Sequence, residues 1–523
     1  MKIKALSLFF IGFGLTSCAM AQVDPLAQKY ASEITVQSAT KHLTILASDE
    51  FEGRDTGKPG GEKAAKYLEE EFKKLNLIAP VNGSYRQAVE LVESKFDVKS
   101  FSINGKARAV GDGYYMTGSG EATTVESKDI VFIGYGISSE KYDDLKGLDI
   151  SGKVVLLINE GEPLNSKGVS YISGTTELSE WASQRNKRIQ AIQAKNPKLI
   201  LAVSSEVPNI LKRFGDNFSR ARIMLAEDQK KASASVAVAH ISTEVADEIL
   251  KKSKTSVADL KAKIGKSGKP ASKVYNAAIQ ASYGTDVRPV EAYNVMGYLE
   301  GGDLKDELVV ISAHYDHVGI EGGEIFNGAD DDGSGTTGVL EMAKAFAKSK
   351  ADGNGPRRSM LFLAVTAEEK GLLGSDYYSR HPVFPLANTV TNLNIDMIGR
   401  VDPPHEANPN YIYLIGSDKL SSELHAISEK ANETYVQMDL DYKYNDPNDP
   451  ERIYYRSDHY NFAKHGIPVV FYFNGVHADY HKASDTVDKI NFEMLVKRTK
   501  LVFHTAWDVA KRDKRPVVDS NKK

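Results

Sequence analysis

From Tyr293 onward, two patterns of apolar and polar residues alternate along the chain, one typical of strands and one typical of helices. Short apolar runs bounded by polar turns predict buried strands. These runs are 295–299, 308–313, 360–366, 390–395, 411–415 and 468–473. Apolar residues three and four positions apart predict helices over 338–348, 421–431 and 492–511. Strands that alternate with helices predict an α/β fold with a mostly parallel central sheet flanked by helices.

The first half of the chain shows two further patterns. Residues 25–77 have a helical pattern, in which Ala64, Leu68 and Phe72 recur on one helix face. Between residues 107 and 280, short β-rich runs alternate with connections rich in Lys, Ser and Gly. These runs are 129–137, 154–159, 199–204 and 236–241. Because this stretch has no histidines and acidic residues at ligand spacing, we interpret it as a smaller β-rich insert without catalytic groups.

These patterns predict a discontinuous catalytic domain over 22–106 and 281–515, with the insert at 107–280 and a polar tail at 516–523. A chain of 523 residues is too long for one ordinary hydrophobic core, which agrees with two domains. Its 41% apolar and 26% charged residues are typical of a globular protein. The net charge is −4, and both signs are mixed along the chain without a basic stripe. This charge pattern argues against a nucleic-acid partner.

Residues 1–21 are predicted to be an export signal peptide. Lys2 and Lys4 form a positive start, and an apolar run too short to span a bilayer follows. Residues 15–18, Leu-Thr-Ser-Cys, resemble a bacterial lipobox, which would leave a lipidated Cys18 at the new N-terminus. Residues 19–21, Ala-Met-Ala, fit ordinary signal cleavage instead.

Both processing routes stay open at this point. Cys18 is the only cysteine in the chain, which favours the lipobox because the residue otherwise has no partner. Lipidation would anchor the protein in the cell envelope, for example at the outer membrane, whereas ordinary cleavage would release it to the periplasm or the medium. Either route leaves a protein without disulfides, whose metal sites must use His, Asp and Glu.

Candidate metal ligands follow three predicted strands directly. His314 follows the second strand, the pair Glu368 and Glu369 follows the third, and Asp396 follows the fourth. Two further groups lie on predicted loops, the aspartate run 330–332 and His481. In an open α/β sheet the functional groups gather at the carboxyl ends of the strands. If the strands are neighbours, these side chains converge on one rim of the sheet.

Each group also has an explanation that needs no metal. An H-x-D triplet such as that of His314 and Asp316 occurs often by chance, although this spacing would let Asp316 accept a hydrogen bond from a metal-binding His314 and orient its ring. A Glu-Glu pair is common at a solvated helix start. Three consecutive aspartates repel one another, so either a flexible loop holds them apart in water or a bound cation holds them together. Asp396 is harder to explain, because a carboxylate in an apolar stretch needs a cation or several donors to offset its desolvation.

Taken together, the motifs resemble the M28 family of zinc peptidases, with the order and spacing of that family. The motifs are HYDHVG at 314–319, NGADDDGSG at 327–335, AEE at 367–369, NIDM at 394–397, YH at 480–481 and DT at 485–486. The stretch 46–54 resembles the N-terminal segment of bacterial members. The insert resembles, more weakly, the protease-associated domain that many members carry. The fold implied is that of the zinc-dependent exopeptidases.

The resemblance implies a site for two Zn²⁺ ions. Asp331 would bridge both ions, His314 and Asp396 would hold one, and Glu369 and His481 would hold the other. A hydroxide between the ions would attack the peptide bond of a peptide or protein N-terminus, which makes the protein an aminopeptidase.

Other residues receive supporting roles from the same resemblance. Glu368 matches the general acid and base, and Tyr480 matches a residue that helps hold the developing oxyanion. Asp316 would lie behind the ligands, and the stretch 457–459 would have a structural role near the pocket. The remaining histidines, His317 among them, are interpreted as surface or core residues, and the acidic run 439–449 as a solvated loop rather than a calcium site.

Two alternative functions remain open. One is another enzyme on the same scaffold, such as a carboxypeptidase or a glutaminyl cyclase, and a cyclase would be expected to work with one zinc. The other is a binding protein on a degenerate peptidase scaffold, against which the presence of all five ligands and Glu368 argues.

Overall fold

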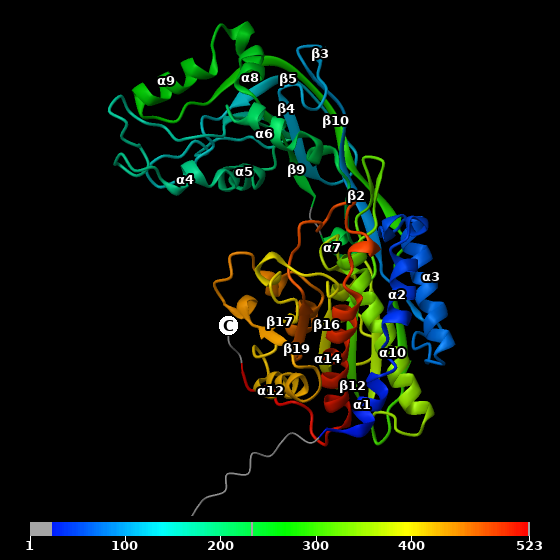
Figure 1. The fold of residues 1–523 in the computed structure, drawn as a ribbon. Coiled ribbons are helices and arrows are strands. Elements are labelled where there is room, and N and C mark those ends of the chain that lie inside the picture. The colour runs from blue at the N-terminus through cyan, green and yellow to red at the C-terminus, as the bar shows by residue number, and fades with distance from the viewer. Residues whose placement is uncertain (1–22, 232–233, 521–523) are drawn as a thin grey trace, which may run out of the picture. The chain divides into compact units, whose positions relative to one another are not determined.

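The computed structural model describes residues 23–231 and 234–520. The predicted signal peptide and Cys18 lie outside the described residues. Contacts between Cα atoms divide the chain into two units (Figure 1). One unit is Glu90–Val290, and the other consists of the described residues on either side of it. Each unit is described by itself below.

The unit formed by the two ends of the chain is built on one sheet, which has eight strands within the described residues. Their order is β1–β11–β15–β12–β16–β19–β17–β18. Their bounds are Arg86–Ala88 (β1), Tyr293–Leu299 (β11), Arg358–Val365 (β15), Leu304–His314 (β12), Thr389–Ile395 (β16), Val469–Phe473 (β19), Tyr411–Ile415 (β17) and Asp439–Asp441 (β18). The four central strands β15, β12, β16 and β19 are parallel to one another. Antiparallel pairs lie outside them, at β1–β11, β11–β15 and β19–β17. The predicted α/β sheet is confirmed.

Helices cover both faces of this sheet, because alternate residues of the central strands point to opposite faces and are apolar on both. Val309 and Ile311 of β12 pack with α2, α3, α10 and α14, whereas Leu308 and Val310 pack with α11 and α13. Figure 1 shows α10 and α14 running alongside the sheet. The helices are α1 (Pro25–Ala31), α2 (Val36–Leu46), α3 (Pro59–Lys74), α10 (Gly335–Ala351), α11 (Leu373–Arg380), α12 (Ser422–Ala431), α13 (His459–Ala463) and α14 (Phe492–Lys511).

Local sequence signals set the ends of several of these helices. Pro59 stands in the first turn of α3, where its missing N–H costs nothing. Ser421 and Asn491 accept hydrogen bonds from backbone amides in the first turns of α12 and α14. The three helices predicted in the second half of the chain therefore correspond to α10, α12 and α14.

The unit Glu90–Val290 has its own sheet and its own core. Within the described residues, the sheet has nine strands in the order β3–β2–β10–β5–β6–β7–β9–β4, and β8 pairs with β2. Its strands are β2 (Leu91–Ile103), β3 (Lys106–Ala107), β4 (Tyr114–Ser119), β5 (Thr123–Phe132), β6 (Val154–Ile158), β7 (Leu199–Val203), β8 (Arg222–Leu225), β9 (Ser235–Ile241) and β10 (Lys273–Val290). Its helices are α4 (Glu180–Ser183), α5 (Arg185–Gln193), α6 (Val207–Phe214), α7 (Ala226–Lys231), α8 (Thr243–Leu250) and α9 (Val257–Ser267).

This second unit is longer than the predicted insert 107–280. β2 and β10 pair in antiparallel register along most of their length, so residues 91–103 and 281–290 belong to its sheet. The sequence analysis assigned both stretches to the catalytic domain. Apolar and polar residues alternate along β10, which gives a strand with one buried face rather than an apolar run. No helix in the described part of the chain is long and apolar enough to cross a membrane.

Candidate metal centre

The strand ends bring the predicted ligands to one rim of the first sheet. His314 is the last residue of β12, Glu368 and Glu369 follow β15, and Asp396 follows β16 directly. β12 lies between β15 and β16 and is parallel to both, so the three carboxyl ends meet. The loop before α10 adds Asp331, and the loop after β19 adds His481.

Asp331 lies at the centre of the cluster, with one carboxylate oxygen facing each of two groups of side chains. Its Oδ1 is 3.3 Å from His314 Nε2, which is itself 3.6 Å from Asp396 Oδ1. Its Oδ2 is 3.0 Å from His481 Nε2, which is 3.2 Å from Glu369 Oε2. Because the two oxygens of one carboxylate face different groups, Asp331 has the position of a bridging ligand.

A residue that the sequence analysis placed at the surface or in the core lies in the second group. His317 is fully buried, and its Nδ1 is 2.9 Å from Glu369 Oε1 and 3.7 Å from Asp331 Oδ2. Within the described residues, the sets of three ligand-type side chains close enough for one ion are His314, Asp331, Asp396 and His317, Asp331, Glu369. His317 is the second histidine of the HYDH motif, which was the available sequence signal for a ligand. Because the motif continues into a loop, no periodicity predicts the direction of this side chain.

The neighbours of Asp331 in the aspartate run hold the loop in place. Asp332 accepts hydrogen bonds from the backbone amides of His314, Gly335 and Met397 at 2.9–3.2 Å. Asp330 accepts one from the amide of Gly399 at 2.6 Å. Backbone amides bind Asp332 and one oxygen of Asp330, whose other oxygen lies 3.1 Å from His477 Nε2. Asp331 alone of the run faces both ligand groups.

Arg54 stabilises the same loop from behind. Its guanidinium is 1% exposed and donates hydrogen bonds to the backbone oxygens of Tyr315, Leu46, Asn327 and Gly328 at 2.6–2.8 Å. Burial lowers its pKa, and the nearby carboxylates of the site oppose this effect. The motif around residues 46–54 thus contributes a buried cation that holds the ligand-bearing loops together.

Asp316 supports the site differently from the prediction. The Nδ1 of His314 lies 3.0 Å from the backbone oxygen of Asp316, whereas the Asp316 carboxylate is 3.8 Å away. That carboxylate accepts hydrogen bonds from the Glu368 amide at 3.1 Å and from the Thr56 hydroxyl at 3.0 Å. The backbone of Asp316 therefore orients the His314 ring, and its side chain fixes the turn that carries Glu368.

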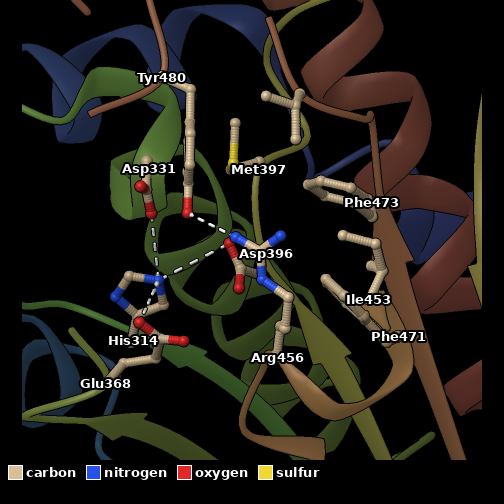
Figure 2. Close-up of a pocket in the computed structure, with 11 residues that line it drawn as sticks. His314, Asp331, Glu368, Asp396, Met397, Ile453, Arg456, Phe471, Phe473 and Tyr480 are labelled. Carbon is tan, nitrogen blue, oxygen red and sulfur yellow. Dashed lines mark hydrogen bonds and ion pairs between the residues drawn. The ribbon is translucent and has the colours of Figure 1, made fainter. Parts of the chain in front are cut away.

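A pocket opens beside the cluster. Figure 2 shows His314, Asp331 and Glu368 on one side of it and the apolar side chains of Ile453, Phe471 and Phe473 on the other. Further lining residues are Asp396, Met397, Arg456, Val476 and Tyr480. The pocket thus joins a polar end next to the ligand groups to an apolar end.

Glu368 faces this pocket without belonging to either ligand group. Its Oε2 is 3.9 Å from His314 Nε2. Burial raises its pKa, and the charges of Glu369 and Asp396 add to that rise against the effect of His314. A raised pKa means a higher proton affinity, which is the property a proton acceptor needs. Burial also raises the pKa of Tyr480, so its phenol stays an O–H donor.

The charges and donor atoms of the cluster fit zinc. Burial alone would raise the pKa of Asp331, but the neighbouring imidazoles of His314 and His481 hold it well below its usual value. Burial would lower the pKa of His481, whereas Asp331 and Glu369 raise it to about 10. Positive charge therefore stabilises the carboxylates of the cluster. Nitrogen and oxygen ligands at the usual distances from one tetrahedral zinc lie about 3.4 Å apart, close to the spacings here.

Comparison with known proteins also identifies a peptidase domain in this chain. Residues 294–506 match the model of peptidase family M28. This region is an M28 peptidase domain. The resemblance predicted from the motifs is thereby confirmed for it.

Individual relatives match less than half of the chain. The chain is 28% identical over 231 residues to aminopeptidase YwaD of Bacillus subtilis, which spans 43% of this chain and 46% of the relative. It is 32% identical over 246 residues to a probable leucine aminopeptidase 2 of Aspergillus oryzae, over 42% of this chain and 44% of the relative. The chain thus spans about half the length of the curated relatives it matches.

The match to a solved structure can extend over nearly the whole chain. An aminopeptidase from Aneurinibacillus sp. strain AM-1 aligns with a TM-score of 0.50 over 94% of this chain and 98% of its own, at 17% identity. At this identity the match shows the fold alone, and it includes the second unit.

The stretch 457–459 of the M28 domain lies next to the pocket. The Ser457 hydroxyl donates a 2.6 Å hydrogen bond to Asp396 Oδ2, which leaves Oδ1 facing His314. Asp458 and His459 are fully buried, and burial raises the pKa of Asp458 to about 7 and lowers that of His459 to about 3. Among the described residues, neither ligand group includes a side chain from the acidic run 439–449.

Proposed function

We propose that the protein is an aminopeptidase that hydrolyses N-terminal peptide bonds with two zinc ions. The observation that carries the proposal is Asp331, whose two carboxylate oxygens each face a separate ligand group. His314 and Asp396 complete one group, and Glu369 and His481 complete the other. When bound, two such ions lower the pKa of a water and stabilise the charge that develops on the substrate.

The chain's own residues would perform the remaining steps. Glu368 would take a proton from the attacking water and pass it to the leaving amine. The hydroxyl of Tyr480, which lies 3.4 Å from a guanidinium nitrogen of Arg456, would donate to the developing oxyanion. Both groups line the same pocket, on which the ligand groups also border.

The residues that line the pocket support cleavage at an N-terminus. Its apolar end, with Ile453, Phe471 and Phe473, has the chemistry to bind the side chain of a first residue. The carboxylates at its polar end, such as Asp396, suit the positive charge of a free α-amine.

The number of ions separates this function from the main alternative. A glutaminyl cyclase on the same scaffold would be expected to use one zinc, whereas the structure offers two ligand groups that share Asp331. Glu368 in the pocket argues against a binding protein that has lost its chemistry.

Removal of metal is expected to abolish activity. We expect chelation to stop hydrolysis of a panel of aminoacyl chromogenic substrates, and zinc to restore it, because no charged side chain of the pocket can replace a dication. Elemental analysis before and after chelation should show about two zinc ions per chain and then none, as paired metal sites imply. Full activity in a sample shown to be metal-free would contradict the proposal.

We also propose that residues of the unit Glu90–Val290 supply no metal ligand, in agreement with its interpretation as an insert of protease-associated type. Neither ligand group includes a described residue of this unit.

Export with a lipid anchor is a separate proposal that rests on the sequence of residues 1–21. The lipobox-like residues 15–18 lead to the expectation that the mature protein begins at a diacylated or triacylated Cys18. Mass spectrometry of the N-terminal peptide, purified from the membrane fraction of a bacterial host, measures this directly. An unmodified N-terminus at Gln22 would instead show ordinary cleavage and release.

A further inference from the structure

The second ligand group contains one more histidine than the family resemblance assigns to it. His317 lies three residues after His314 and is fully buried. Its Nδ1 lies close to one oxygen of Glu369, at 2.9 Å, and to one oxygen of Asp331, at 3.7 Å. The ring of His481 stands nearly perpendicular to it, with a centroid distance of 5.7 Å. Two imidazoles thus approach the same pair of carboxylates.

The three atoms that meet here lack aligned hydrogen bonds. His317 Nδ1, Asp331 Oδ2 and Glu369 Oε1 are buried, and none of them has a hydrogen-bond partner of acceptable geometry among the described residues. A buried polar atom without a partner is costly, and three that converge on one point share one explanation. A cation between them would satisfy all three at once.

The fold keeps a place for the His317 ring. Gly328 has a φ of +53°, and a Cβ at this position would lie 2.5 Å from Cγ and Cδ2 of that ring. Only glycine leaves room there, and its backbone oxygen accepts a 2.8 Å hydrogen bond from buried Arg54. The loop beside the ring is thereby fixed. The imidazole is therefore held against the two carboxylates, which is not expected of a histidine that merely fills space in the core.

We propose that His317 Nδ1 is a further ligand of the second ion, in addition to Asp331, Glu369 and His481. This inference rests on the two-zinc function proposed above. It makes the two sites unequal, because the first has three protein ligands, His314, Asp331 and Asp396, and the second has four. A zinc site with three protein ligands keeps a position for water or substrate, and a fourth protein ligand should hold the second ion more tightly.

The inequality has a measurable consequence for the order in which the sites fill. The second site should bind the first equivalent of zinc, and it should bind that ion through two imidazoles. The second equivalent should enter the site of His314, which offers one imidazole. The average number of imidazoles per zinc should therefore fall from about two to about 1.5 as the second ion binds, given four-coordinate sites of this kind.

X-ray absorption spectroscopy of the full chain loaded with one and then two equivalents of zinc tests this prediction. In His317→Ala we expect about one imidazole per zinc at both loadings. Competition with a chelator should show that the tighter Kd rises by at least about 10–100-fold, the loss that even a hydrogen-bonding partner of a ligand causes. The Kd of the other ion should change little.

Two further variants complete the experiment. His504→Ala removes another buried histidine, one that stacks on Tyr435 and belongs to neither ligand group, and it should keep the zinc affinities and imidazole counts of the unchanged protein. His317→Gln preserves much of the side-chain volume without an imidazole, and it carries the test if the alanine variant does not fold.

Three outcomes would overturn the inference while leaving the two-zinc function intact. They are one imidazole per zinc in the unchanged protein that binds two ions, unchanged affinities in both His317 variants, and an equal loss of both ions in them. Binding of a single ion, or none, by the unchanged protein would instead contradict the proposed function itself.

Discussion

Replacing Glu368 with glutamine is expected to lower kcat by at least about 10²–10⁴-fold, the usual contribution of a positioned general base, while both zinc ions stay bound. The carboxylate faces the pocket and lies 3.9 Å from His314 Nε2, outside both ligand groups. The amide keeps the shape of the side chain but cannot accept the proton of water. Steady-state kinetics on an aminoacyl substrate, together with zinc content measured on the same sample, checks the expectation.

The neighbouring residue provides the matched control. Glu369→Gln changes the same functional group one position along the chain, but its Oε2 lies 3.2 Å from His481 Nε2 within the second ligand group. Zinc content should therefore fall at one site in this variant. If Glu368→Gln loses metal while Glu369→Gln keeps both ions, the two roles are reversed. Normal activity in both variants would exclude the mechanism.

The fold of the first unit follows closely from the sequence pattern. The central strands are buried on both faces, so they are nearly continuous apolar runs, and six such runs correspond to β11, β12, β15, β16, β17 and β19. The unit boundary was harder to place, because most of β2 is half-buried, much of β10 alternates between buried and exposed residues, and neither strand is an apolar run. Pairing between residues near 90 and residues near 290 sets the boundary of the unit. That pairing cannot be predicted from either segment alone.

Part of the candidate site can also be predicted from the sequence, and part cannot. Ligand-type residues directly after apolar strands, such as His314 and Asp396, can be located from sequence because parallel strand ends meet at one edge. The sequence cannot show which atom of Asp316 orients the His314 ring, since backbone and carboxylate compete for that position. The sequence also cannot predict the direction of the His317 side chain, which depends on the loop at Gly328 and on Arg54 behind that loop.

Replacing Asp331 with asparagine is expected to remove both zinc ions and, with them, all measurable activity. The carboxylate is the one side chain common to both ligand groups, with Oδ1 at 3.3 Å from His314 Nε2 and Oδ2 at 3.0 Å from His481 Nε2. An amide offers one oxygen and no negative charge, so neither group keeps a complete set of ligands. Zinc content after dialysis, measured beside hydrolysis of an aminoacyl substrate, checks both parts of the expectation.

Asp330→Asn makes the same chemical change one residue earlier in the loop. The Asp330 carboxylate accepts hydrogen bonds from the Gly399 amide at 2.6 Å and from the Ser334 hydroxyl at 3.0 Å, and an asparagine oxygen can still accept them. This variant should therefore keep both ions, which separates the loss of a bridging ligand from a general disturbance of the loop. If Asp331→Asn holds two ions, or if both variants lose zinc equally, Asp331 is not the bridge between the two groups.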